Sequence, residues 1–311
     1  MTIKQVFSRL HDQYMRQMDI PLKFLAFAGD RRCTPNPHRL PSWLPDYSTE
    51  AQHWPSGCLK RDLYMADKGM RTVSRIKADE VLLVTGCECD MITRVESRKI
   101  FVEPRFEAFY RDYAENADRS LMYPTGITKF QAFVRTLFFD MIDSRTPCRM
   151  DALDFETQAR MVGLLILNFD YREQVDIESE ELRTELFRNA LTVLFSEQDL
   201  TQLGEQIDKT VERMKSVFMN SSFVKRILRA KRPSRRRLFH TKHGYIGLGP
   251  KDASIGDKVC VVGGSPMPIL LRKLEDRYEH VGTCFVLGYM DGEVGKLITE
   301  GKLVEQEFEI V

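Results

Sequence analysis

The chain opens with apolar residues at helical spacing. Charged residues lie between these positions, so one face of the segment is apolar and the other is polar. This pattern predicts an amphipathic helix that ends before Pro21. The apolar positions are Val6, Leu10, Tyr14 and Met18. From residue 31 to 55, prolines and turn-forming residues disfavour a regular helix.

Short strand-like runs replace the helical spacing between residues 71 and 102. One run covers residues 81–84, a second covers residues 91–95, and Thr85-Gly86 lies between them. Because this glycine is a turn signal, the pattern predicts a β-hairpin. An isolated hairpin leaves unpaired N–H and C=O groups along both edges, so these strands need further partners.

Residues 103–232 return to helical spacing. Apolar residues recur three or four positions apart in two stripes, which predicts helices that each bury one face. The stripes are Ile127, Phe130, Val134, Leu137, Phe138 and Met141, and then Phe155, Ala159, Val162 and Ile166. Further helices are predicted over residues 178–195 and 197–228.

After Pro233 the chain consists of short apolar runs punctuated by glycines. The runs lie near residues 238–241, 258–262, 269–271 and 278–287. Short strands with turns this close together predict a small barrel or sandwich. The residues predicted to serve as structural turn positions are Gly244, Gly247, Gly249, Gly256, Asp257, Gly288 and Gly292.

Together, these patterns predict an α+β fold. We expect a small antiparallel β-barrel or sandwich built from residues 58–102 and 237–311, because the predicted hairpin needs the later strands as neighbours. Residues 103–236 are predicted to be a helical insertion between these segments that ends in a basic linker. Residues 1–57 are predicted to form an N-terminal helix and a loop rich in proline and tryptophan.

Charge and composition narrow the class of protein. The 46 Lys and Arg nearly balance the 45 Asp and Glu, and a net charge of +1 gives no global attraction to nucleic acid or anionic lipid. Seven irregularly spaced cysteines suit a reducing compartment better than a disulfide framework. No apolar run reaches the roughly 20 residues of a membrane span, and the first residues lack a signal segment. We therefore expect a cytoplasmic protein, with the nucleus as the alternative.

Two candidate binding motifs have structural alternatives that we favour. The glycines from Gly244 to Gly249 follow the order G-x-x-G-x-G, and Pro250 stands where a phosphate loop would start a helix. Cys87 and Cys89, with Cys58, could supply thiolates to a metal, but C-x-C is not the usual zinc spacing. The favoured interpretations are a strand and turn for the glycines and packing for the cysteines.

Two candidate acid–base groups also have a structural interpretation, which we favour. His240 and His243 could form a general-base pair with Asp257, or they could be ordinary surface or hydrogen-bonded histidines. Asp291 and Glu293 form a close acidic pair, and Asp291 fits the role of a helix N-cap. We therefore predict no catalytic, cofactor-binding or metal-binding residue, and no enzymatic activity.

Two stretches are candidates for interaction. The segment 225–237 holds eight basic residues and no acid, which suits a solvated linker, a nuclear import signal or contact with phosphates. Trp43 and Trp54 lie among prolines and could form a docking surface, although burial that orders the loop is the simpler interpretation. The basic residues are Lys225, Arg226, Arg229, Lys231, Arg232, Arg235, Arg236 and Arg237.

Longer motifs resemble a known family. One is Leu40-Pro41-Ser42-Trp43-Leu44-Pro45-Asp46-Tyr47-Ser48. A second runs from Arg237 through Gly244-Tyr245-Ile246-Gly247-Leu248-Gly249-Pro250 and Gly256-Asp257 to Asp291-Gly292-Glu293. Weaker matches cover residues 82–92 and 133–140. These stretches, in this order, resemble the region that follows the heterokaryon-incompatibility domain of fungal proteins.

The resemblance implies a role in self/non-self recognition. We expect a non-catalytic C-terminal regulatory or interaction region with a protein partner, and the domain that names the family is expected upstream of residue 1. Tyr47, Leu44 and Thr283-Cys284 depart mildly from the family pattern. The alternatives are a phosphate-binding or nucleic-acid-binding module that uses residues 225–237, and a truncated gene product without independent function.

Overall fold

A computed structural model describes residues 3–29, 38–46, 63–77, 80–96, 122–127, 129–137, 139–140, 209 and 236–311. The chain divides into two compact units. One unit combines residues 1–97 with residues 235–311, and the other is residues 98–234. The helices predicted over residues 155–166, 178–195 and 197–228 lie outside the described residues, apart from the single helical residue Lys209. Within the described part, no helix is long and apolar enough to cross a membrane.

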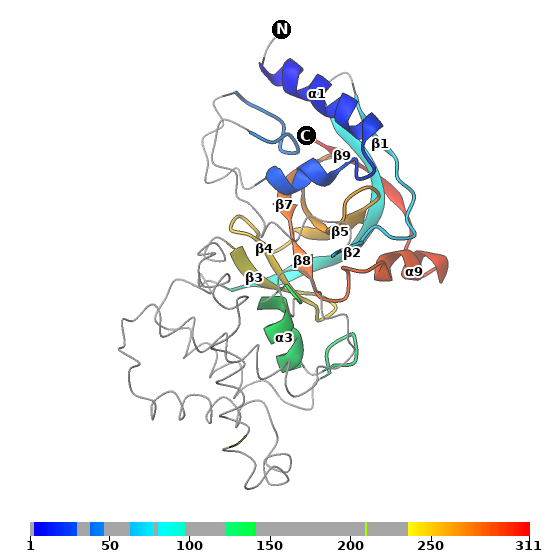
Figure 1. The fold of residues 1–311 in the computed structure, drawn as a ribbon. Coiled ribbons are helices and arrows are strands. Elements are labelled where there is room, and N and C mark those ends of the chain that lie inside the picture. The colour runs from blue at the N-terminus through cyan, green and yellow to red at the C-terminus, as the bar shows by residue number, and fades with distance from the viewer. Residues whose placement is uncertain are drawn as a thin grey trace. The chain divides into compact units, whose positions relative to one another are not determined.

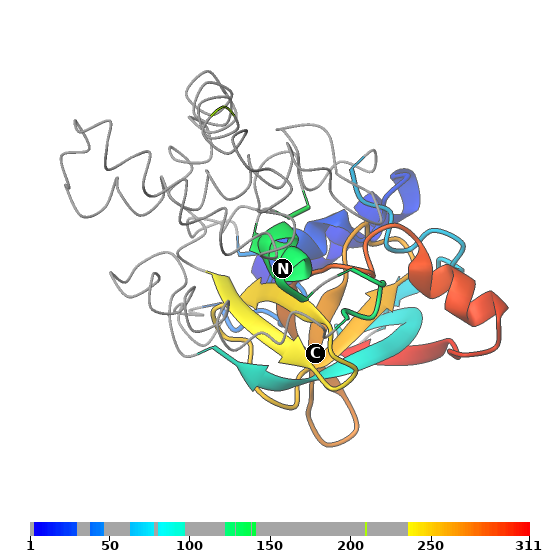
Figure 2. The same cartoon turned by 90° about the horizontal axis from the view of Figure 1, so that it is seen from below.

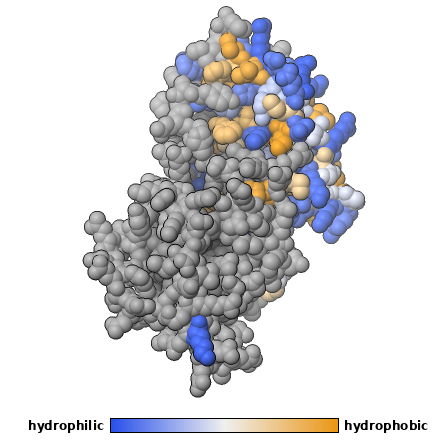
Figure 3. Space-filling model, viewed as in Figure 1, coloured by the Kyte–Doolittle hydropathy of each residue, from blue (hydrophilic) through white to orange (hydrophobic). Residues whose placement is uncertain are grey.

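The predicted N-terminal helix is present as α1 (Ile3–Gln17), and the 3-10 helix η1 (Lys23–Phe27) follows it. The inward face of α1 differs from the predicted one, because aromatic contacts with η1 set the rotation of the helix. The ring of His11 packs edge-on against Phe24 with centroids 4.6 Å apart, and Tyr14 packs against the same ring at 6.1 Å. Ser8, His11 and Met15 are therefore the buried side chains. Three apolar residues of the predicted stripe lie on the surface instead: Val6 (41% exposed), Leu10 (54%) and Met18 (49%). Figure 3 shows hydrophobic residues among hydrophilic ones on the surface of the described part of the chain.

The described strands form one sheet, and its longest strand is β2 (Leu82–Val95). The other strands are β1 (Ser74–Ile76), β3 (Arg236–Thr241), β4 (Ile246–Pro250), β5 (Lys258–Val262), β6 (Ile269–Lys273), β7 (Tyr278–Thr283), β8 (Phe285–Val286) and β9 (Gln306–Ile310). The helices besides α1 are α3 (Lys129–Leu137) and α9 (Glu293–Thr299).

The hairpin predicted over residues 81–95 is wrong, because β2 runs through Thr85-Gly86 without a turn. Glycine is needed here for a close approach between strands. A Cβ on Gly86 would meet the carbonyl oxygen of Val261 and would lie 2.7 Å from Cγ1 of Val262. The strand does contain an irregularity, between Glu88 and Asp90, where its register against β5 shifts. β2 curves along its length (Figures 1 and 2).

Five strands pair in a closed circuit that begins and ends at β2. β2 pairs with β5, β5 with β6, β6 with β7, β7 with β9, and β9 with β2. The β7–β9 pair is parallel, and the other pairs in this circuit are antiparallel. The far end of β2 continues the sheet into β3, β4 and β8. Strands from residues 82–95 and from residues 236–310 thus share one sheet, in agreement with the expectation that two distant segments build the β region.

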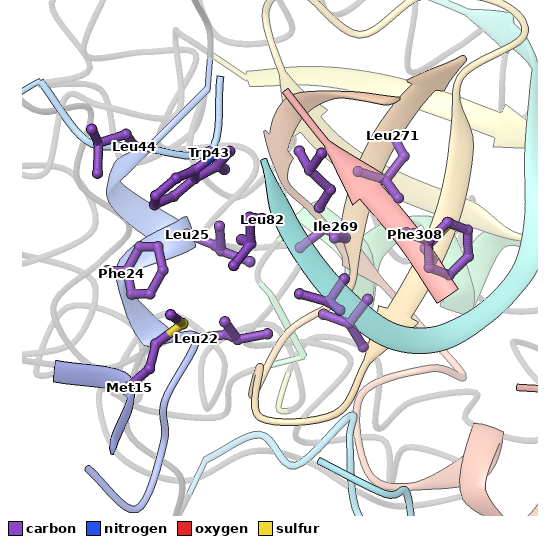
Figure 4. Packing of buried hydrophobic residues seen from close by; sticks show 14 of the residues in the cluster. Met15, Leu22, Phe24, Leu25, Trp43, Leu44, Leu82, Ile269, Leu271 and Phe308 are labelled. Carbon is purple, nitrogen blue, oxygen red and sulfur yellow. The ribbon is translucent and has the colours of Figure 1, made fainter. Parts of the chain in front are cut away.

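Side chains on the two faces of the circuit belong to two hydrophobic clusters. In β5, Cys260 and Val262 join the first cluster while Val259 and Val261 join the second, as the alternation of a strand requires. The N-terminal segment also contributes side chains to the first cluster, among them Leu25 (Figure 4). Its other labelled members in that view are Met15, Leu22, Phe24, Trp43, Leu44, Leu82, Ile269, Leu271 and Phe308. The space between the strands of the circuit is therefore packed with apolar side chains.

The unit of residues 98–234 is described around α3. Arg135 Nε lies 2.6 Å from Asp140 Oδ1, and Arg135 Nη2 lies 3.0 Å from Asp140 Oδ2. Both side chains are buried, so this bidentate pair joins the end of α3 to the turn that follows it. The weaker family-like stretch at residues 133–140 therefore includes a structural ion pair.

Candidate functional site

Trp43, a candidate docking residue, does not lie on the surface. Its side chain is fully buried in the first hydrophobic cluster, and its Nε1–H donates to the carbonyl oxygen of Glu80 at 3.1 Å. Its burial agrees with the simpler of the two interpretations, in which Trp43 orders the loop, and does not support the alternative of a docking surface. Trp54 lies outside the described residues.

The neighbouring Ser42 joins several distant segments. Its N–H donates to the carbonyl oxygen of Val311 at 2.9 Å, and its hydroxyl donates to the same oxygen. That hydroxyl oxygen also accepts the backbone N–H of His280 at 2.8 Å, and Nε2 of His280 lies 3.0 Å from the carbonyl oxygen of Leu25. The family-like residues around Ser42 and Trp43 thus hold the N-terminal segment against β7 and β9.

The basic segment is described only at its end. Arg236 and Arg237 are the first residues of β3 rather than part of a linker, which corrects the predicted boundary at residue 236. The Arg236 guanidinium donates to the carbonyl oxygen of Thr283, and that of Arg237 donates to the carbonyl oxygen of Ala253, both at 3.0 Å. These two side chains therefore stabilise the sheet. The other candidates, Lys225, Arg226, Arg229, Lys231, Arg232 and Arg235, lie outside the described residues.

The glycine-rich motif forms a turn and a strand. Gly244 has φ +87° in the turn between β3 and β4, and its N–H donates to the carbonyl oxygen of Thr241. A Cβ on Gly247 would lie 2.6 Å from a ring carbon of Phe239, and a Cβ on Gly249 would lie 3.1 Å from the same ring. These glycines therefore make room for Phe239. Gly256, Gly288 and Gly292 also have positive φ, in turns.

Asp257 has a different partner from the predicted histidines. Its carboxylate accepts two hydrogen bonds from Arg272, with Nε–Oδ1 and Nη2–Oδ2 distances of 2.8 Å, and a third from the N–H of Ser254. The Asp257 side chain is 1% exposed. A bidentate pair of this kind is among the strongest polar contacts in proteins. The proposed general-base set of His240, His243 and Asp257 is therefore not assembled.

The two histidines have carboxylates of their own. His240 Nε2 lies 3.2 Å from Glu96 Oε1 and 2.7 Å from Nη2 of Arg94, on the β2–β3 pair. His243 Nδ1 lies 3.1 Å from Asp90 Oδ1. One other predicted role also changes. Asp291 is not an N-cap, because Gly292 precedes α9 without a side-chain cap and the N–H of Asp291 donates to Glu293.

Among the described residues, the Asp90–His243 pair is the arrangement best suited to acid–base or nucleophilic chemistry. The Asp90 side chain is fully buried, whereas that of His243 is 62% exposed. Asp90 also accepts the N–H of Met91 at 2.8 Å and, more weakly, the N–H of His243 at 3.3 and 3.4 Å. A buried carboxylate this close to Nδ1 favours one tautomer of an imidazole, as it does in catalytic and metal-bound histidines.

An aromatic pair lies beside Asp90. The rings of Tyr245 and Tyr289 stack with centroids 4.4 Å apart and an interplanar angle of 31°. Burial raises the pKa of Tyr245, and the nearby charge of Asp90 contributes to this rise. Burial also raises the pKa of Tyr289, with the neighbouring Tyr245 as the next cause. Both phenols therefore stay protonated, and they act as packing and hydrogen-bonding groups at neutral pH.

The described cysteines are buried thiols. Burial raises the pKa of Cys87 to about 11, and the charge of Glu305 adds to this effect. Burial likewise raises the pKa of Cys89, Cys260 and Cys284. Protonated thiols are poor nucleophiles and poor ligands. In the described part of the chain, no group of three or more His, Cys, Asp or Glu side chains could hold a metal ion, and Cys58 lies outside that part.

Sequence reasoning singled out His243 but missed Asp90. The two residues are 153 positions apart, and the register between β2 and the β3–β4 turn brings them together. The only local signal for Asp90 is the motif Cys87-Glu88-Cys89-Asp90, whose two cysteines indicate a metal site instead.

Comparison with known proteins gives one match. Residues 202–302 match the model of the Het-6 beta-barrel domain, which is about a third of the chain. No curated protein and no solved structure matches the chain. The matched segment includes β3 to β8 and α9, while β2 and β9, which complete the circuit of pairings, lie outside it.

Proposed function

Because residues 202–302 carry a Het-6 beta-barrel domain and fit the C-terminal region of a heterokaryon-incompatibility-type protein, we propose that this chain is a non-catalytic interaction and regulatory region. In this role the β unit is a rigid platform for a protein partner, and any toxic or catalytic step belongs to a separate domain. The packed apolar interior of the strand circuit is the observation that carries the proposal. Such an interior supports surface contacts rather than a buried ligand.

The hydrogen bonds made by the polar candidate residues support the same role. Asp257 and Arg272 stabilise each other, and Arg236 and Arg237 bind backbone carbonyl groups of the sheet. These groups are therefore used to build the platform.

The exposed apolar residues of α1 offer a surface for such a partner. Val6 and Leu10 lie one helical turn apart, and more than a third of each is exposed. Exposed apolar side chains that are adjacent on a helix favour contact with another protein.

Affinity capture from the source cells tests the proposed interaction. We expect a partner that binds the wild-type chain and is lost with the double variant Val6→Ser/Leu10→Ser. The matched control is Gln13→Ser/Gln17→Ser, which changes two exposed polar residues of the same helix and is expected to keep the partner. Equal capture by all three proteins would contradict α1 as the contact surface.

Turnover assays test the proposal that the chain has no catalytic activity. The purified chain is expected to hydrolyse neither nicotinamide nor purine nucleotides above the buffer rate. Turnover that a single substitution within the chain abolishes would overturn the proposal.

A further inference from the structure

The turn between β3 and β4 places one imidazole beside a buried carboxylate. His243 Nδ1 lies 3.1 Å from Oδ1 of Asp90, and a carboxylate oxygen can only accept a hydrogen bond. At this distance Nδ1 can donate to the carboxylate, which favours a neutral His243 ring with its proton on Nδ1. Its lone pair then lies on Nε2, which has no hydrogen bond within the described part of the chain and belongs to a side chain that is 62% exposed.

The backbone holds this arrangement in place. The N–H of Lys242 donates to the carbonyl oxygen of Met91 at 2.9 Å, which ties the turn to β2 beside Asp90. The Thr241 hydroxyl oxygen accepts the N–H of Tyr245 at 3.0 Å. Gly244 provides the positive φ that the turn requires. The backbone that carries His243 is thus already ordered when Nε2 attacks an electrophile.

The other described histidines differ from His243. His11 is buried, and its Nδ1 lies 2.8 Å from the carbonyl oxygen of Phe7. His280 is buried with Nε2 on Leu25, and His240 uses Nε2 in its ion pair. His38 makes no hydrogen bond or ion pair within the described residues, so it provides a histidine without an orienting carboxylate.

We propose that His243 is a phosphoryl-accepting histidine, with Asp90 as its positioning residue. This modification goes beyond the proposed interaction function and does not require it. Nε2 attacks the phosphorus of a small phosphoryl donor such as an acyl phosphate or phosphoramidate, so an Nε2–P bond forms as the bond from phosphorus to the leaving group breaks. The leaving group departs with the electron pair of that bond, as a carboxylate from an acyl phosphate or as neutral ammonia from a phosphoramidate whose nitrogen is protonated.

Charge at the turn favours this reaction. The ring becomes positive as Nε2 forms its bond, and the adjacent Asp90 carboxylate stabilises that charge while Nδ1 keeps its proton. The neighbouring Lys242 is exposed and carries a positive charge that attracts the anionic donor. The product places negative charge on an exposed turn of the β unit, where it can alter contact with a partner.

Incubation of the full chain with potassium phosphoramidate tests the proposal. Site-resolved mass spectrometry under alkaline conditions should show phosphorylation of His243 at least about tenfold faster than that of His38 or His240, a difference of about 1.4 kcal/mol in barrier. Asp90→Asn should remove this advantage and leave the rate at His38 unchanged. Glu88→Gln, which alters another β2 carboxylate that is paired with Lys258, is the matched control and should keep it.

The tautomer gives a second readout that needs no variant. Nitrogen-15 spectra of the wild-type chain should show His243 with its proton on Nδ1. A proton on Nε2, or phosphorylation of His243 no faster than that of His38, would overturn the proposal. An unchanged His243 rate in folded Asp90→Asn would overturn the role of Asp90.

Discussion

At the scale of single residues, the polar groups with the most contacts stabilise the β unit. Arg272 bridges Asp257 and Glu279 and also donates to the carbonyl oxygen of Asp252 at 2.9 Å. Its contact with Glu279 is longer, at 3.3 Å, and Glu279 is 26% exposed. A buried charge that loses its partner is costly, whereas a longer ion pair with a partly exposed carboxylate contributes less. The two carboxylates should therefore differ strongly in their effect on stability.

Asp257→Asn is expected to lower the free energy of unfolding by about 3–5 kcal/mol, because it leaves Arg272 without its buried counter-charge. The control Glu279→Gln is expected to cost less than about 1 kcal/mol. Denaturant unfolding of the two variants and the wild type measures both values. Similar losses for the two variants would contradict the assignment of Asp257 as the main partner.

Residue-scale prediction from the sequence identified positions but not their partners. Asp257 was recognised as a turn residue, yet its bond to Arg272 depends on the register between β5 and β6. His243 was considered with Asp257, whereas the fold pairs it with Asp90. Local patterns carry no information about such registers, since a shift of one residue would move each side chain to the other face.

At the scale of elements, Gly86 allows β2 to continue as one strand. The local sequence indicates a turn at Thr85-Gly86, but β2 continues through it because β5 approaches so closely there. The strand therefore pairs with β9 before Gly86 and with β5 after it. Tertiary contact overrides the local turn signal, which is why the predicted hairpin was wrong.

Gly86→Ala is expected to lower the free energy of unfolding by about 1–3 kcal/mol, because its Cβ would overlap the backbone of Val261. Thr85→Ala changes the adjacent, half-buried residue and is expected to cost about 1 kcal/mol or less. Thermal and denaturant unfolding of both variants checks the difference. A neutral Gly86→Ala substitution would contradict the close approach of β2 and β5.

The docking of α1 should depend on pH through His11. Burial lowers the pKa of His11, while its hydrogen bond to Phe7 opposes this shift. Above pH about 6.5 the ring is neutral in both the folded and unfolded chains and contributes no pH dependence. As the pH falls below that value, the unfolded chain takes up the proton more readily, so stability falls.

His11→Phe should weaken this loss between pH 7.5 and pH 5.5, because phenylalanine can keep the packing against Phe24 without a titrating group. Denaturant unfolding of both proteins at each pH gives the comparison. An identical pH dependence in the wild type and the variant would exclude His11 as a source of the acid sensitivity.

At the scale of the whole molecule, the central claim is that one β unit is assembled from two distant segments. The unpaired edges of a strand near residues 81–95 led to this expectation from the sequence, and the pairings of β2 with β3, β5 and β9 agree with it. The Het-6 beta-barrel match covers only part of this sheet. The predicted helical character of residues 103–236 is described only at α3 and Lys209, so it stays a prediction for most of that segment.

Limited proteolysis of the full chain within residues 98–234, followed by size-exclusion chromatography under native conditions, tests this claim most directly. The fragment that contains β2 and the fragment that contains β3 to β9 should elute together, because β2 supplies a strand between β5 and β9 and joins β3 to the circuit. Their complex should unfold in a single transition. Elution of residues 236–311 as a separate fragment that keeps its strand content would contradict the assembly of one β unit from two segments.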